Sequence, residues 1–160
     1  MKKGSIIFLQ VVITLIGIGT LTLLLWEPHL EGRNAHSTLS QIYFNDPFLA
    51  YAYIGSIAFF VALYQAFKLS GYVGKNEVFS QEAVKSLRTI KYCALIIISF
   101  VVGAEAYIWI TVRGKDDIAG GVAMGLFIIF DSLVITATAA VFEKLLRQVI
   151  NIKSENDLTV

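Results

Sequence analysis

The stretch that decides the fold is Gly120–Ile150, GGVAMGLFIIFDSLVITATAAVFEKLLRQVI. Its first part is apolar apart from Asp131 and is long enough to cross a hydrocarbon core of about 30 Å at about 1.5 Å per residue. After that part, four apolar residues recur at helical spacing, Val141, Leu145, Val149 and Ile152, opposite a polar face with Glu143, Lys144, Arg147 and Gln148. We therefore predict a membrane helix over about 119–140 that continues outside the bilayer as an amphipathic helix.

The composition of the whole chain supports a membrane protein. Of the 160 residues, 56% are hydrophobic and only 16% are charged, and the mean hydropathy is +0.70. Soluble domains have about 45–50% apolar residues, so we predict a polytopic integral membrane protein in a cell membrane. The net charge of +1 argues against direct binding to nucleic acid. A single cysteine excludes a disulfide or a cysteine-based zinc site within one chain.

Three further apolar runs predict membrane helices over about 5–26, 48–69 and 92–112. Between the second and third, Gly71 and Gly74 are expected to break the helix. We predict an all-α, four-helix transmembrane bundle formed by a single domain, 1–160, with a cytosolic extension and tail over 141–160.

A helix start is predicted at about 80–91, running on into the third span. Ser80 suits an N-cap, and Glu82 falls in the first turn, where the helix dipole favours an acid. Phe79 and Val84 have the spacing of a hydrophobic staple around that cap.

Lysine and arginine predict the orientation. With both termini inside, the inner segments hold ten of these residues and the outer loops hold three, Arg33, Arg113 and Lys115. An excess of positive charge marks the cytosolic side, so both termini are expected there.

Two acids, Glu105 and Asp131, fall inside apolar spans. An ionised carboxylate at the bilayer centre costs at least about 2.5–3.5 kcal/mol, so both should face the bundle interior, be protonated or border water. A proton or cation site in one outward-facing pocket is one interpretation. The other, which we favour, is a pair of structural carboxyl groups that hydrogen-bond to neighbouring helices.

Small residues at helical spacing predict close helix contacts, because packing and polar contacts hold helices together in lipid. These contacts can lie within one chain, which we favour, or can form a homo-oligomer. The predicted packing residues are Ala58, Ala62, Gly103, Gly121 and Gly125.

The sequence contains no catalytic pattern that we recognise. His29, Glu31 and His36 in the first outer loop form at most a weak metal pattern. We therefore expect no catalytic residue, no metal site and no cofactor.

Two segments together carry a family resemblance. Val78–Ile90, VFSQEAVKSLRTI, resembles a segment between helices 2 and 3 of the domain of unknown function 2975 family, which consists of small four-helix bacterial membrane proteins. Val141-Phe142-Glu143, followed by ENDLTV at 155–160, resembles the end of that family. The chain departs from the family at Asn76-Glu77, where a proline-like turn is usual, and at 145–148, where glycine is frequent.

The resemblance implies a partner but no catalytic residues. Genes of the family commonly neighbour a small helix-turn-helix regulator, which implies a membrane protein that interacts with a cytosolic transcription factor. We predict a non-enzymatic protein with a regulatory or interaction role, and a small proton- or cation-coupled carrier using Glu105 and Asp131 as the alternative. The predicted cytosolic interaction residues are Phe79, Ser80, Val84, Leu87, Arg88, Asp157, Leu158, Thr159 and Val160. These segments can also simply pack on each other, which we favour without excluding a partner.

Overall fold

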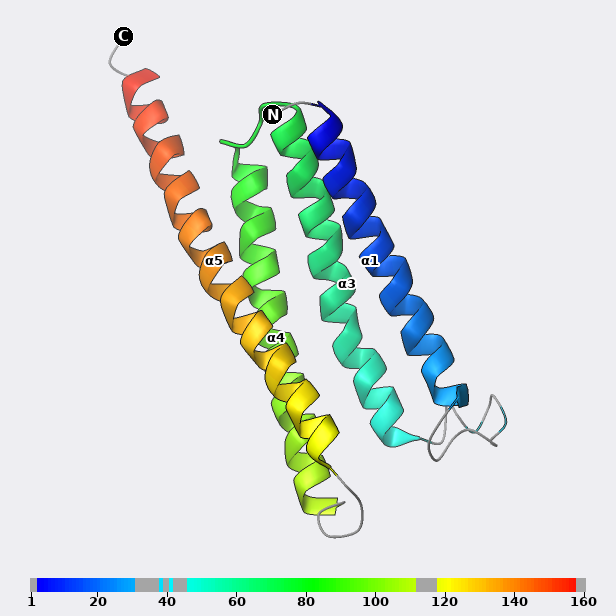
Figure 1. Cartoon of the computed structure of the whole chain (residues 1–160). Helices are drawn as coiled ribbons and strands as arrows, with labels where there is room; N and C mark the ends of the chain where they lie inside the picture. The colour runs from blue at the N-terminus through cyan, green and yellow to red at the C-terminus, as the bar shows by residue number, and fades with distance from the viewer. Residues whose placement is uncertain (1–2, 31–37, 39–40, 42–45, 112–117, 158–160) are drawn as a thin grey trace.

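Four long α-helices make up most of the part of the chain that the structure describes (Figure 1). The computed structural model describes residues 3–30, 38, 41, 46–111 and 118–157. The helices are α1 (Lys3–Leu30), α3 (Pro47–Gly74), α4 (Gln81–Thr111) and α5 (Ala119–Asp157). Each of them is long and apolar enough to cross a membrane, and the described residues form no strand.

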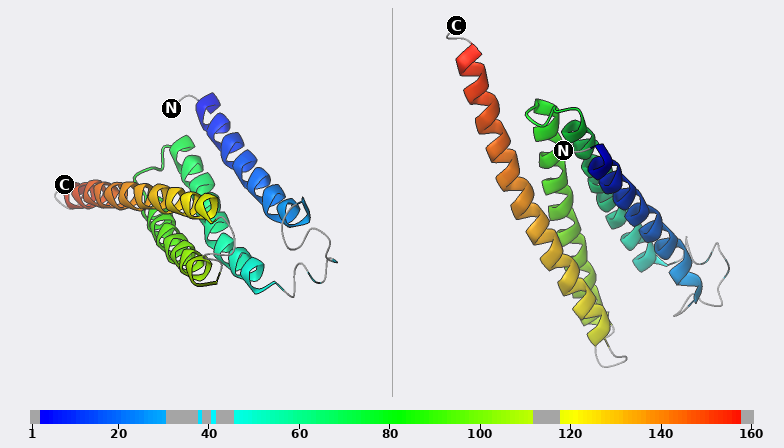
Figure 2. Two further views of the ribbon diagram at one scale, coloured as in Figure 1. Left: turned by 60° about the horizontal axis from the view of Figure 1, so that its bottom comes forward. Right: turned by 45° about the horizontal axis from the view of Figure 1, so that its top comes forward.

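The helices pack in chain order, each antiparallel to the one before it (Figure 1). The main contacts join α1 to α3, α3 to α4, and α4 to α5. As a result, both chain termini lie at one end of the molecule, which we call the terminal end. The last turns of α5 diverge from α4 and project beyond the other helices (Figure 2).

Each predicted span falls on one helix, and the helices extend beyond the apolar runs, except that the third span ends at about 112, one residue past the end of α4. Gly71 does not break α3, which continues to Gly74. In the turn after the helix, Asn76 adopts a φ of 60°. Asparagine tolerates this left-handed backbone, so the chain can turn sharply there. The predicted start near 80 and the third span form the continuous helix α4. The tail is helical as far as Asp157.

The face that α5 turns towards α4 follows a heptad pattern. Its less exposed residues recur at alternating intervals of three and four, which is the period of left-handed helix packing. This packing face consists of Val122, Gly125, Ile129, Ser132, Thr136, Ala139, Glu143, Leu146 and Ile150. The α4–α5 pair therefore packs along most of its length with one regular register.

The best-buried part of the molecule lies at the terminal end. A core of buried residues joins α4 to α5, and residues of α3 and of the turn before α4 pack against it. Most large apolar side chains elsewhere are exposed, as expected for helices whose outer surface faces lipid. The buried members of the core are Ala83, Val84, Leu87, Ala139 and Leu146.

Candidate functional site

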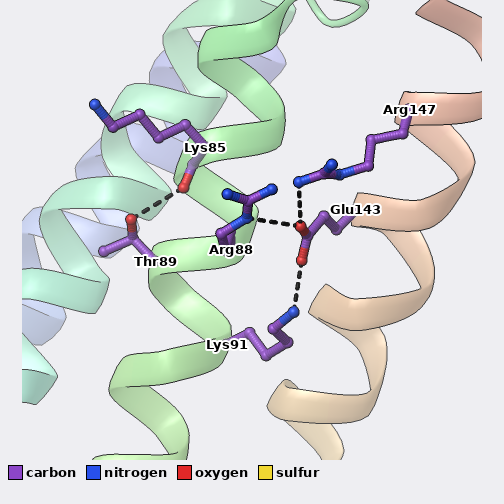
Figure 3. A network of polar contacts seen from close by, with 6 residues as sticks. All are labelled: Lys85, Arg88, Thr89, Lys91, Glu143 and Arg147. Carbon is purple, nitrogen blue, oxygen red and sulfur yellow. Dashed lines mark hydrogen bonds and ion pairs between the residues drawn. The ribbon is translucent and has the colours of Figure 1, made fainter. Parts of the chain in front are cut away.

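A buried glutamate at the terminal end gathers three basic side chains (Figure 3). Glu143 on α5 is only 7% exposed. Its Oε1 accepts hydrogen bonds from Arg88 Nε and from Arg147 Nη2, both at 2.9 Å, and its Oε2 accepts one from Lys91 Nζ at 2.7 Å. Such charge-assisted hydrogen bonds are stronger than neutral ones, so this glutamate cluster ties α4 to α5.

Helical spacing brings these four residues together. Glu143 occupies a position of the α5 packing face, so it points at α4. Arg88 and Lys91 are three residues apart on α4 and therefore share the face towards α5. Arg147 lies one turn after Glu143 on the same helix and completes the cluster from the side. A charged residue at one heptad position fixes the register of two helices, because any shift would leave the charge unpaired.

The sequence patterns did not predict this cluster. They placed Glu143 on the polar face of α5, opposite Val141, Leu145, Val149 and Ile152. In the structure that assignment is wrong, because these four apolar residues are exposed and Glu143 is buried. The heptad spacing from Gly125 through Ser132 and Ala139 was the signal that would have found it.

The predicted interaction residues before and within α4 fall into three groups. Val84 and Leu87 are buried in the core, and Arg88 belongs to the glutamate cluster. Ser80 caps α4, since its Oγ accepts a hydrogen bond from the Ala83 amide at 3.2 Å. Phe79 is 58% exposed, whereas Val84 is buried. The neighbouring Val78 packs on the core instead.

The predicted C-terminal interaction residues lie mostly beyond the described part of the chain. The backbone of Asp157 is the last helical position of α5. Leu158, Thr159 and Val160 lie outside the described residues, as do Glu31 and His36 of the first loop. The described residues contain no group of three metal-ligating side chains.

The two intramembrane carboxylates do not share a site. Glu105 on α4 lies directly over Gly125 of α5, and its Oε2 is buried without a hydrogen-bond partner among the described residues. Asp131 is exposed on the surface of α5, away from the packing face. Of the three expected arrangements, facing the bundle interior therefore does not apply to Asp131 within this chain.

A partly open cavity of about 340 Å³ lies between α3 and α4, at the end opposite the terminal end. Its lining is largely apolar and aromatic, and the rings of Phe48 and Tyr107 stack at 5.7 Å. Neither Glu105 nor Asp131 lines it, so it is not the predicted ion pocket. The lining residues are Pro47, Phe48, Tyr51, Gly103, Ala104 and Tyr107.

Two of the predicted small residues lie at close helix contacts. A side chain on Gly125 would overlap the Glu105 carboxylate, and one on Gly103 would meet the Tyr51 hydroxyl, which donates to the Phe100 carbonyl at 3.0 Å. Gly121 is different, because an added Cβ would make only an ordinary contact with Ile108 at 4.0 Å.

The two predicted alanines lie on α3. Ala58 is buried and Ala62 is partly buried. Their burial fits close helix packing within the chain. The homo-oligomer stays a prediction.

Similarity to known proteins agrees with the fold. The chain is 42% identical to the "Uncharacterized membrane protein YoaS" of Bacillus subtilis (strain 168), over 161 residues and the full length of both chains. No solved structure is significantly similar to it. The sequence profile of the family described as "Protein of unknown function (DUF2975)" matches residues 32–160. With four helices that can span a membrane and this match over most of its length, the chain is a multi-pass membrane protein that belongs to the DUF2975 family.

Proposed function

We propose that this protein is a non-enzymatic membrane protein that binds a cytosolic protein partner through the projecting end of α5. One observation carries the proposal. Beyond the apolar part, which ends at about 140, α5 continues to Asp157 and exposes four apolar residues on the face away from α4. We call Val141, Leu145, Val149 and Ile152 the outer strip. Helix α4 covers only the opposite face of α5. The outer strip is therefore free to contact another molecule.

The depth of the outer strip favours a protein over lipid. Val149 and Ile152 lie about 14 and 18 Å beyond the apolar part along the helix, at about 1.5 Å per residue, which is past the hydrocarbon core. Lys144 and Lys153 are exposed next to the strip. The matching surface is an apolar groove with acidic side chains at its rim, as in proteins that bind amphipathic helices.

The inside orientation expected from lysine and arginine places the outer strip in the cytosol. The family resemblance suggests that the partner is a small helix-turn-helix regulator. The glutamate cluster and the buried core hold α5 against α4 just before the helix projects. The projecting end is therefore held in a fixed position in which it can bind a partner.

Affinity capture of the full-length protein in mild detergent tests the proposal. We expect a helix-turn-helix regulator among the captured proteins, and we expect at least about tenfold less of it with Val149→Glu/Ile152→Glu, because two charges cannot enter an apolar groove. The control is Asn151→Asp, which adds a charge at an exposed position on another face of the same helix. Absence of such a regulator, or equal capture by both variants, would refute the role.

The carrier remains the second candidate because of one observation, the buried and unpartnered Oε2 of Glu105. Under the interaction role, liposomes containing the protein should show no proton or cation flux above empty liposomes. A flux that disappears in both Glu105→Gln and Asp131→Asn would establish the carrier instead. The separation of the two acids on different helix faces is the reason to expect no flux.

A further inference from the structure

The glutamate cluster carries a surplus of positive charge. Three cationic side chains surround one carboxylate, so two positive charges are not neutralised within the cluster. The Lys91 side chain is 22% exposed, whereas those of Arg88 and Arg147 are 45% and 44% exposed. The surplus charge is therefore presented to the surroundings by the two arginines.

Both arginines have hydrogen-bond donors left over. Each guanidinium carries five N–H donors. Arg88 donates to Glu143 through Nε only, and Arg147 through Nη2 only. Within the part of the chain that the structure describes, neither makes another hydrogen bond to protein. The remaining donors are arranged in planar forks, the geometry that binds phosphate oxygens in pairs.

Glu143 holds the two forks side by side. Arg88 Nε and Arg147 Nη2 contact the same oxygen, each at 2.9 Å, so these two nitrogen atoms lie within about 6 Å of each other. The arginines reach this oxygen from α4 and α5 respectively (Figure 3). Two guanidinium groups this close repel each other, and a second anion beside them would relieve that repulsion.

The depth of the cluster points to a membrane surface. On α5, Glu143 follows the apolar part by about three residues, and on α4, Arg88 precedes it by about four, so both lie about 5–6 Å outside the hydrocarbon core. That is the level of the lipid headgroups. Tyr92, the first residue of the apolar part of α4, is exposed, with the Lys91 ammonium 5.1 Å from its ring centroid. An aromatic ring at this level is typical of the membrane interface.

We propose that Arg88 and Arg147 bind the phosphate of an anionic membrane lipid, with Glu143 as the residue that positions them. The lipid bridges α4 and α5 at the headgroup level, while its acyl chains lie along the exposed apolar surface of the helices. This site is independent of the outer strip and of the protein partner. It requires only that the cluster lies at the bilayer surface.

Thermal unfolding of the full-length protein in mild detergent, titrated with lipid, tests the site. Phosphatidylglycerol is expected to raise the melting temperature, and phosphatidylcholine, whose headgroup has no net charge, is expected to raise it much less. In Arg88→Gln/Arg147→Gln the apparent affinity for phosphatidylglycerol should fall at least about tenfold. The matched control is Lys85→Gln, one turn before Arg88, because the Lys85 ammonium points away from the cluster (Figure 3).

Two results would overturn the proposal. One is an unchanged phosphatidylglycerol affinity in the double variant. It would mean that the general positive charge of the protein attracts the lipid and that the two arginines form no site for it. The other is an equal stabilisation by inorganic phosphate at the same concentration, which would assign the arginines to a free anion. If the glutamine variant does not fold, Arg88→Lys/Arg147→Lys keeps both charges but removes the forks. It should bind at least about threefold more weakly, and wild-type affinity in it would contradict the proposed geometry.

Discussion

Glu143→Gln is expected to lower the free energy of unfolding by about 2 kcal/mol, because hydrogen bonds to charged groups contribute about 1.5–3 kcal/mol and three cations lose their counter-charge. Glutamine keeps the size of the side chain, so the packing of α5 on α4 is not otherwise disturbed. The partial exposure of Arg88 and Arg147 keeps the loss below that of a fully buried ion pair. Titration of the purified protein with a denaturing detergent, followed by circular dichroism, measures it.

Lys144→Gln is the matched control for that variant. It also removes one charge, from the next residue of α5, but Lys144 is exposed and outside the cluster. Its effect should stay within about 0.5 kcal/mol. Equal losses in the two variants would show that Glu143 does not hold α4 and α5 together.

Gly55→Ala should destabilise the protein by about 1–3 kcal/mol through the α3–α4 contact. A Cβ at Gly55 would lie 2.8 Å from Phe100 Cδ1 and 3.3 Å from Phe100 Cβ. The ring cannot simply turn away, because Phe100 Cβ is itself close, so the helices must separate. The same detergent titration measures the loss.

Gly19→Ala on α1 separates this clash from a general effect of glycine. An added Cβ at Gly19 meets nothing within 4 Å. Alanine favours a helix over glycine by about 0.5–1 kcal/mol, so this variant should be neutral or slightly more stable. A loss of stability at Gly19 as large as at Gly55 would contradict the packing described for α3 and α4.

The membrane helices were predictable from the sequence, whereas the charge cluster was not. A run of about 20 apolar residues has few alternatives to a membrane helix, and the cap at Ser80 marked the start of α4 correctly. The ends of the helices were less predictable, because helical turns outside the lipid need no apolar run. For this reason α5 extends to Asp157 rather than ending near the last apolar residue.

The faces of α5 were predicted the wrong way round for a physical reason. In water, apolar residues such as Val149 and Ile152 would be expected to face the core. Within the membrane part of α5 the lipid-facing surface is apolar as well, so hydrophobicity does not separate inside from outside there, and the packing face set in that part continues through Glu143 into the turns outside the bilayer. Small residues and a charge with partners mark the packing face instead, as Gly125, Ala139 and Glu143 do. Two of the three partners of Glu143 lie more than 50 residues away on α4, and only the fold brings them to it.

Both proposals depend on Glu143 joining α4 to α5. A double-mutant cycle between Glu143→Gln and Lys91→Met measures the energy of this connection most directly. The two side chains meet at 2.7 Å across the helix contact. The cycle should give a coupling energy of at least about 1 kcal/mol, because each single variant already removes the same interaction. Additive losses, with a coupling energy near zero, would contradict the account.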